Sequence, residues 1–411
     1  MHRKFHKRME EMLRRDAPFV VATVIRVRGS AAARPGAKSI IDGEGRAVFG
    51  WVGGGCVESF VCAEAKEALA AGSPRIITAD LEDELSGVGL PCGGVMEIFI
   101  EPIMPRRRVL ILGGSEVALH ASEILERIGF AVSSFRAAGI ELTAQASALD
   151  TIELERGALI IIASAGENSY DLGPLLNAEP EYMAVIPPPE GQAQAGLDLG
   201  GTSPAELALS IVAEMLAVTR SAAARPLQEM KTDEPVGAFE SVPERVTQPS
   251  LTIVGHSSIT EELAWMAARL GWPVSVDGAG ALEESYPAGA VIIRDDADFS
   301  RMPAGPDTAL VVATHHKCDH LAIERALDAG SWYVGLIASA HRSKLVRAML
   351  EDSLQRDARL KTLRAPSGLD IGAATPAEIA LSIMSEVLAC FHGRTGRPRM
   401  ERFAAETQSD A

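Results

Sequence analysis

A glycine-rich turn that ends in a cysteine is the sharpest chemical signal in this sequence. The motif runs through Gly53, Gly54, Gly55, Cys56, Val57 and Glu58. Consecutive glycines allow positive φ angles and bring backbone amides close to a ligand. A helix is expected to begin at Cys56, and a helix N-terminus favours the thiolate, which is the nucleophile and metal ligand. A small buried cysteine in a tight turn is the alternative, and the motif alone leaves both open.

A second cysteine has the same glycine-rich surroundings. The stretch Pro91, Cys92, Gly93, Gly94 repeats the pairing of a thiol with flexible backbone. Two such turns in one block predict a shared site for a soft metal or sulfur, in which Cys56 and Cys92 are the candidate catalytic and metal-binding residues. A structural cause for both turns is the competing interpretation. The five cysteines contain no CxxC pair, which argues against a four-cysteine zinc site.

A local run of basic residues lies upstream of the first cysteine. Arg26, Arg28, Arg34 and Lys38 fall within 13 residues of a chain whose net charge is -16. Arginine forks and loop amides suit phosphate and other oxyanions, so Arg34 and Lys38 are candidate cofactor-binding residues. An exposed, solvated loop is an equally good interpretation of the same residues.

Two stretches resemble the glycine fingerprint of a dinucleotide-binding fold. They are Gly113-x-Ser115-x-x-Ala118 and Gly255-x-Ser257-x-x-Thr260, each after a short apolar run. In the standard fingerprint the second glycine lets the backbone approach a pyrophosphate, and here a serine stands in its place. Gly255, Ser257 and the later Asp277, which could contact a ribose, are candidate residues for FAD or NAD(P). The altered fingerprints leave open that no dinucleotide binds tightly.

Two further patterns carry polar side chains. The stretch from Thr314 to His320 is dense in metal-ligand types and includes His315, but a polar loop over a sheet edge explains it as well. Asp198 and Asp370 occupy a repeated turn ahead of two helices. We expect each aspartate to cap its helix.

The elements that position these residues fall into three blocks, of which the first is a mixed α+β domain at 1–103. It has strands expected at 19–28, 38–41, 47–52, 75–80 and 95–101 and a helix at 58–71. A truncated Rossmann-like domain at 107–220 and a C-terminal Rossmann-like domain at 250–395 follow. Both alternate strands and helices, which predicts an α/β fold with doubly wound parallel sheets. Residues 221–249 form a proline-containing linker, and 396–411 form a tail.

An internal repeat supports this division. Residues 197–218 and 369–390 are identical at 13 of 22 positions, and each stretch combines a turn, a proline at the first helical position and an amphipathic helix. The two helices are expected to pack against each other or across a dimer.

Composition restricts the classes of function. The acidic net charge argues against nucleic acid as a partner. No run of about 18 apolar residues predicts a transmembrane segment. Five cysteines in 411 residues suit a reducing cytoplasm.

The order of these motifs resembles a known family. The stretches ATVIRVRGSAAARPGAK (22–38), GGGCVE (53–58) and LPCGG (90–94) are similar to the N-terminal domain of xanthine dehydrogenase accessory proteins of the XdhC/CoxI type. Residues 313–315, 333–337, 368–372 and 375–380 resemble that family's C-terminal Rossmann domain. Alanines 31–33 stand where family members often have Ser-Pro.

The resemblance implies a cofactor chaperone more than a turnover enzyme. Members bind molybdenum cofactor (molybdopterin), take part in its sulfuration with a cysteine desulfurase, and deliver it to an apo-molybdenum hydroxylase of the xanthine dehydrogenase, aldehyde oxidase or CO dehydrogenase type. Cys56 and Cys92 match the family's cysteines, His315 lies at a matched position, and a homodimer is favoured. The alternatives are an NAD(P)- or FAD-dependent oxidoreductase acting through the third block and a regulatory docking module without cofactor.

Overall fold

The computed structural model divides into two compact units, Met1–Arg107 and Arg108–Ala411. It describes residues 2–29, 31, 33–54, 56–80, 94–135, 156–163, 175, 177, 179–188, 194–227, 248–294, 296, 298–314, 319–353 and 358–397. Among the helices in these ranges, none combines the length and the apolar character that crossing a membrane requires.

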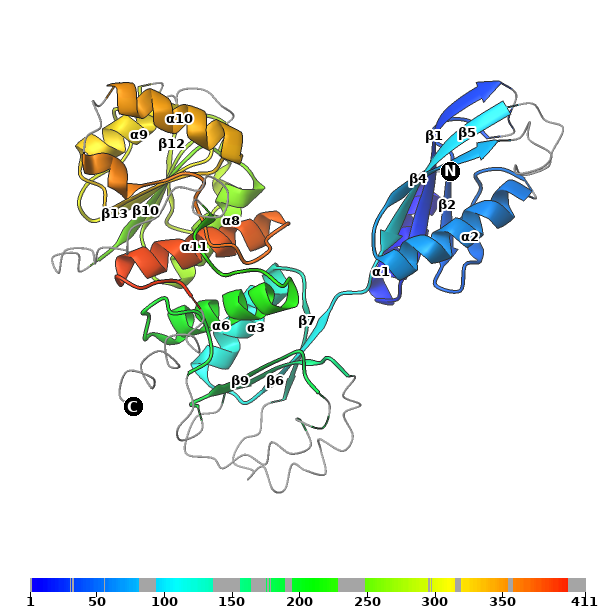
Figure 1. The fold of residues 1–411 in the computed structure, drawn as a ribbon, viewed down its shortest axis with the longest axis horizontal. Coiled ribbons are helices and arrows are strands. Elements are labelled where there is room, and N and C mark those ends of the chain that lie inside the picture. The colour runs from blue at the N-terminus through cyan, green and yellow to red at the C-terminus, as the bar shows by residue number, and fades with distance from the viewer. Residues whose placement is uncertain are drawn as a thin grey trace. The chain divides into compact units, whose positions relative to one another are not determined.

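The first unit is an antiparallel sheet with two helices (Figure 1). Its elements are α1 (His2–Arg14), β1 (Phe19–Gly29), β2 (Lys38–Asp42), β3 (Ala47–Gly50), α2 (Cys56–Ala71), β4 (Arg75–Asp80) and β5 (Gly94–Ile103). The strand order is β3-β2-β1-β5-β4, and every neighbouring pair is antiparallel. The mixed α+β domain expected from the sequence is therefore confirmed.

Side chains alternate along each strand, so the sheet has two faces that carry apolar residues. A helix covers part of each face. Val20 and Ala22 of β1 are buried in one cluster with Val57 and Val61 of α2. Phe19 of β1 belongs to a second cluster on the opposite face. That cluster includes Phe5 and Met12 of α1. Helix α1 therefore covers one face of the sheet.

The second unit contains two parallel sheets, which we call lobe one and lobe two. Lobe one consists of β6 (Arg108–Leu112), α3 (Glu116–Arg127), β7 (Ala131–Phe135), β8 (Leu159–Ala163), β9 (Tyr182–Ile186) and α6 (Pro204–Thr219). Its strand order is β7-β6-β8-β9. All three strand pairs are parallel, as the alternation of strands and helices predicts.

Lobe two repeats this plan with additional strands. Its elements are β10 (Ser250–Val254), α8 (Ser258–Arg269), β11 (Val274–Asp277), η1 (Glu283–Ser285), β12 (Val291–Ile293), β13 (Thr308–Val312), α9 (Asp319–Asp328), β14 (Tyr333–Leu336), α10 (Ala340–Ser353), η2 (Ala358–Thr362), β15 (Leu363–Arg364) and α11 (Pro376–Phe391). In the order β12-β11-β10-β13-β14-β15 all neighbouring strands are parallel, and the point at which the strand order switches lies between β10 and β13. A doubly wound parallel sheet is confirmed here too.

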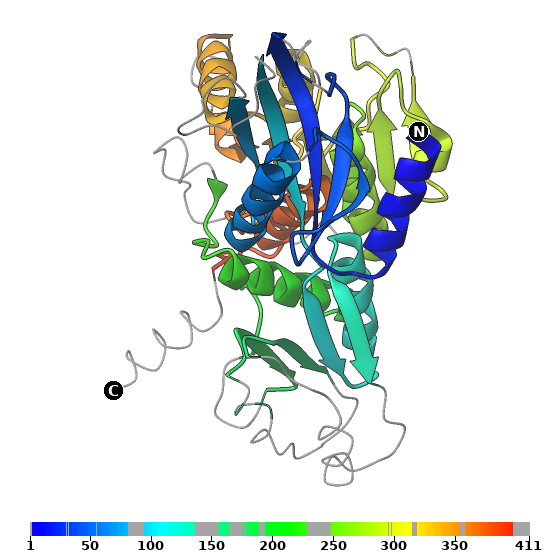
Figure 2. The same cartoon turned by 90° about the vertical axis from the view of Figure 1, so that its right-hand side faces the viewer.

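The two lobes share one hydrophobic core. Leu125 of α3, Leu209 of α6, Leu263 of α8 and Leu381 of α11 all belong to the same buried cluster. Helices α6 and α11 lie side by side in both views (Figures 1 and 2). The repeated helices therefore pack against each other within one chain.

Candidate functional site

Three connections of the N-terminal unit meet at one end of its sheet. Gly29, which ends β1, pairs with Gly94, which begins β5, and Asp80 at the end of β4 pairs with Val95. Helix α2 returns to the start of β4 through a short turn, so its first residue, Cys56, lies at this same end. The described residues at this end, Gly29, Cys56, Asp80 and Gly94, flank segments 30–37, 51–55 and 81–93, of which 81–93 lies outside the described residues. We call this the loop end.

A buried cluster packs parts of the first two connections and the start of α2 against the sheet. Ala33, Val52 and Val57 share it with Ala79 of β4 and Met96 of β5. The first turn of α2 is thus packed onto the strands that carry the other two connections. Because the amides of a first helical turn lack helical partners, this end of α2 can accept an anion or stabilise a thiolate.

Glycine is required at one position of the glycine turn. Gly53 has a φ of 150°, and a Cβ there would lie 2.7 Å from Cγ1 of Val57. A Cβ at Gly54 would meet nothing within 4 Å, and Gly54 is exposed. Gly53 therefore permits close packing of the turn on the helix, whereas Gly54 leaves an open approach to it.

Part of the predicted site lies outside the described residues. This holds for Gly55, Cys92, Gly93, His315 and the side chain of Cys56. The backbone of Cys56 begins α2 as expected, and Gly94 begins β5. The sharing of one site by the two cysteines stays a prediction.

The basic run separates into paired and unpaired cations. Arg26 donates to Glu97 at 3.0 Å, and Lys38 donates from Nζ to Oγ1 of Thr23 at 2.8 Å. The side chains of Arg28 and Arg34 are exposed and make no ion pair or hydrogen bond with the described residues. Among the described residues, these two side chains are the cations of the basic run without a partner, which makes them candidates for binding an anion. The sequence alone does not indicate that the side chain of Arg26 is paired with an acidic residue while that of Arg28 is not.

The remaining cysteine of α2 is unsuited to thiolate chemistry. Burial raises the pKa of Cys62, and the nearby Glu58 carboxylate adds to the shift. Glu58 is half-buried in the first turn of the helix. The Cys62 thiol accordingly stays protonated at neutral pH and packs beside the hydrophobic cluster.

The altered fingerprint of lobe two has a structural explanation. Ser257 caps α8 by accepting from the amide of Thr260, while Oγ1 of Thr260 accepts from the amide of Ser257. Thr260 is fully buried and also contacts the hydroxyl of Tyr286 at 3.0 Å. Side chains therefore use two helix-terminal amides, and Ser257 stands where a glycine would let a pyrophosphate approach.

Asp277 lies at the carboxyl end of β11, beside the fingerprint loop. Its backbone carbonyl accepts from the amide of Gly255 at 2.7 Å. Burial raises the pKa of Asp277 to about 7, and Asp296, which shares a hydrogen bond with it, adds to the shift. Burial also opposes ionisation of Asp296. The amide of Arg301 and other donors outweigh that effect and lower the pKa of Asp296.

The histidine-rich stretch leads into a salt bridge. Asp319, the first residue of α9, is buried and accepts from Arg342 at 2.6 Å and from the hydroxyl of Thr314. This arrangement ties α9 to α10. Within the part of the chain that the structure describes, no group of three or more potential ligands could hold a metal ion.

Each lobe buries a tyrosine–glutamate pair. The Tyr182 hydroxyl donates to Glu214 at 2.7 Å, and the Tyr333 hydroxyl donates to Glu386 at 2.7 Å. The glutamates also accept from the amides of Gly196 and Gly368, just before the repeated turns. The pairs fix these turns onto α6 and α11.

The helix caps correct one expectation. Ser203 and Thr375 cap α6 and α11 with reciprocal capping boxes, so the aspartates of the repeated turn are not the caps. Asp370 instead accepts from the amide of Ala223, which follows α6. The backbone amide of Asp198 donates to Arg397, beyond α11. These turns therefore join each lobe to the segment that leaves the other.

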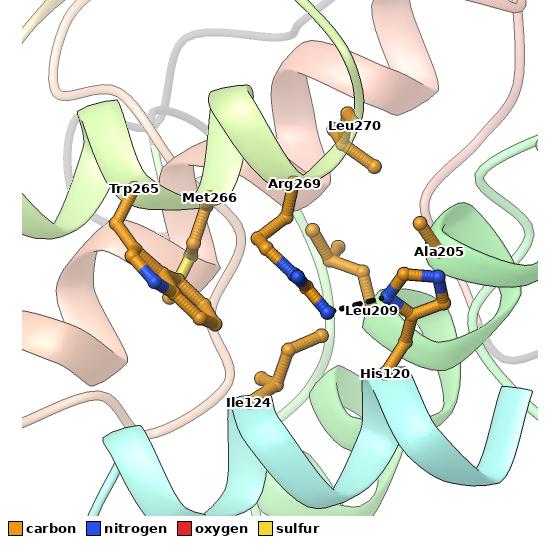
Figure 3. Close-up of a pocket in the computed structure, with 8 residues that line it drawn as sticks. All are labelled: His120, Ile124, Ala205, Leu209, Trp265, Met266, Arg269 and Leu270. Carbon is orange, nitrogen blue, oxygen red and sulfur yellow. Dashed lines mark hydrogen bonds between the residues drawn. The ribbon is translucent and has the colours of Figure 1, made fainter. Parts of the chain in front are cut away.

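A small cavity lies between the two lobes (Figure 3). It is lined by His120, Ile124, Ala205, Leu209, Trp265, Met266, Arg269 and Leu270. Arg269 lies 3.1 Å from Nδ1 of His120, and burial together with this arginine lowers the pKa of His120. None of the residues predicted to carry chemistry lines this cavity.

Comparison with known proteins identifies the family. Residues 12–80 match the XdhC and CoxI family, and residues 251–387 match the XdhC Rossmann domain. These two regions are the N-terminal unit and lobe two. The chain belongs to the XdhC and CoxI family.

Three relatives show how far the likeness extends. The chain is 24% identical to a probable xanthine dehydrogenase subunit of Bacillus subtilis, over 93% of this chain and 96% of that protein. It is 28% identical to the uncharacterised Escherichia coli protein YqeB over 34% of this chain, but spans only 27% of that protein. It is 30% identical to the E. coli molybdenum cofactor insertion chaperone PaoD over 26% of this chain and 34% of that protein.

Among solved structures, a xanthine dehydrogenase from Bacillus halodurans is similar over 93% of this chain and 96% of that one. The two are 19% identical, with a TM-score of 0.32.

Proposed function

We propose that this chain is an accessory factor of molybdenum hydroxylases that binds molybdenum cofactor at the loop end of its N-terminal unit. The meeting of the glycine turn, the start of α2 and the start of β5 at one end of the sheet carries this proposal. Membership of the XdhC and CoxI family and the likeness to the chaperone PaoD support it.

In this proposal the residues of the loop end have different binding roles. Cys56 and Cys92 supply thiolates for molybdenum or for sulfur, because soft ligands suit both. Arg28, Arg34 and Lys38 hold the phosphate of the cofactor. Gly53, Gly54, Gly55, Gly93 and Gly94 let backbone amides approach it, and Glu58 in the first turn of α2 is a further cofactor-binding candidate.

The proposed partners follow from this chemistry. A cysteine desulfurase supplies the sulfur, and an apo-hydroxylase of the xanthine dehydrogenase, aldehyde oxidase or CO dehydrogenase type receives the loaded cofactor. The chain acts in the cytoplasm, where a reducing environment keeps the thiols free. Since α6 and α11 are covered within the chain, the proposed homodimer forms through other surfaces.

An oxidoreductase using FAD or NAD(P) has less support. The Ser257–Thr260 capping box consumes helix-terminal amides that a pyrophosphate would need. We therefore do not propose dinucleotide-dependent turnover.

Cofactor retention by the full-length protein tests the proposal. Purified apo-protein is mixed anaerobically with molybdenum cofactor and passed through a desalting column, and the molybdenum retained per chain is measured. We expect about one equivalent in the wild type and clear losses in Cys56→Ser and Cys92→Ser, because the thiolates are removed.

Cys62→Ser is the matched control, because it removes a thiol from the same unit that stays protonated. Its retention should equal that of the wild type. Failure of the wild type to retain cofactor would refute the proposal. Retention equal to that of the wild type in all three variants would show that Cys56 and Cys92 do not bind the cofactor.

A further inference from the structure

One face of the N-terminal sheet is only partly covered by helix α1. The hydrophobic cluster beneath α1 contains Phe19 and Val21 of β1 and Ile40 of β2. Strands β5 and β4 lie on the other side of β1 in the sheet, and of their described residues only Ile103, at the end of β5, packs against this cluster. Strand β4 and most of β5 therefore lie outside the cluster that α1 forms with the sheet.

Apolar side chains follow one another across this uncovered part. Ile76 of β4 pairs directly with Phe99 of β5, and Phe99 pairs with Thr23 of β1. Directly paired residues point to the same side of a sheet, and Thr23 follows Val21 by two positions, so all three lie on the α1 face. Ile76 is 63% exposed. Phe99 is half-buried and belongs to neither hydrophobic cluster of this unit.

A β-bulge adds a third apolar side chain to this surface. The register of β1 against β5 shifts between Val24 and Arg26, which makes Ile25 the extra residue. Val24 is buried in the cluster with α2 on the opposite face, so Ile25 points to the α1 face, where it is 43% exposed. We call the surface formed by Ile25, Ile76 and Phe99 the open face. Neighbouring exposed apolar side chains of this kind mark interaction sites.

The charged pair on the open face is complementary to itself. Arg26 and Glu97 are directly paired, lie 3.0 Å apart, and have side chains that are 58% and 27% exposed. Glu97 precedes Ile98, which is buried on the α2 side, and so lies on the open face. Across a twofold axis this pair meets an inverted copy of itself, and each cation faces an anion of the other chain. A partner surface of one sign would instead bring one of the two charges against its like.

We propose that two copies of this chain associate open face to open face across a twofold axis that passes beside Arg26 and Glu97. Packing two sheet faces together buries the apolar side chains that α1 leaves exposed. The proposal rests on the homodimer of the proposed function and names its surface. It does not require cofactor binding, because the oligomeric state is measured without cofactor. A failure of this interface and a failure of cofactor retention are therefore separate results.

Gel filtration with light scattering on the full-length protein tests the interface. We expect the wild type to have twice the mass of one chain. Ile76→Asp should lower the association constant about tenfold or more, because a carboxylate would lose water in an apolar contact. Leu345→Asp is the matched control, because Leu345 of α10 is 57% exposed and belongs to the second unit. Its mass should equal that of the wild type.

Exchange of the charged pair tests whether the occupant is a second copy. Arg26→Glu and Glu97→Arg should each be monomeric, because all the charges at the axis then have one sign. An equimolar mixture of the two variants should dimerise, because an acidic pair then faces a basic pair. Far-ultraviolet circular dichroism checks that each variant is folded. A monomeric wild type, a dimer that persists in Ile76→Asp or in either charge variant, or a mixture that stays monomeric would overturn the proposal.

Discussion

Arg28 and Arg34 at the loop end are the charges through which an anionic cofactor can be recognised. Both are exposed and without an acidic partner among the described residues, in a chain of net charge -16. We predict that the double variant Arg28→Gln, Arg34→Gln lowers cofactor affinity about tenfold at low salt, because two contacts to a phosphate are lost. The affinity of the variant should also depend less on salt. Titration of cofactor at two ionic strengths measures both effects.

Arg26→Gln is the control for this experiment. Arg26 lies on the same strand but is already neutralised by Glu97 at 3.0 Å. Its loss should change affinity little, because an exposed pair contributes about 0–1 kcal/mol and offers no free charge. A loss in Arg26→Gln as large as in the double variant would mean that general positive potential, and not these two side chains, recognises the cofactor.

At the residue scale, the sequence indicates candidate residue types for the site but not which of their side chains lack a partner. The glycine turn and Cys56 at a helix start follow from local chain properties. The pairing of Arg26 with Glu97 joins residues 71 positions apart, so the loss of one cation and the freedom of Arg28 depend on strand register.

The glycine turn as an element positions Cys56 through the packing of Gly53 on α2. We predict that Gly53→Ala destabilises the start of α2 by about 1–3 kcal/mol, because the new Cβ would overlap Val57 and strain a φ of 150°. Hydrogen exchange of the amides in the first turns of α2 measures this local effect. Cofactor retention should fall in the same variant.

Gly54→Ala tests whether the effect is steric. A methyl group there meets nothing within 4 Å, so exchange in α2 should match the wild type. Equal exchange in Gly53→Ala and the wild type would show that the turn can move without loss of the helix start.

Element predictions succeeded where local signals were complete. Helices α6 and α11 follow from a proline at the first position and a glutamate three residues after the cap. The same local pattern identifies Ser203 and Thr375 as the caps, a signal that the expectation for the aspartates overlooked. Asp370 bonds to the segment after α6, a contact that its local sequence does not indicate.

At the scale of the whole second unit, the two copies of the internal repeat contact each other symmetrically, the start of each repeated helix meeting the residue that follows the other. Glu206 at the start of α6 contacts His392 after α11 at 2.9 Å, and Glu378 at the start of α11 contacts Arg220 after α6 at 3.0 Å. Burial opposes ionisation of Glu206, but hydrogen bonds from His392 and Ser203 outweigh it and lower its pKa to about 2. The sequence predicted the repeat and left open whether the helices meet within a chain or across a dimer.

The shared core makes the association of the lobes independent of the chain that links them. We predict that a protease site inserted within residues 228–247 can be cleaved without separating the lobes, because one buried cluster spans both. Gel filtration of the cleaved protein should give one peak containing both fragments. Leu209→Asp should release them, since it places a charge beside Trp265 and Met266 of the other lobe and a buried unpaired charge costs several kcal/mol. Separation of the cleaved wild-type fragments in non-denaturing buffer would show instead that the linker, and not the shared hydrophobic core, holds the lobes together.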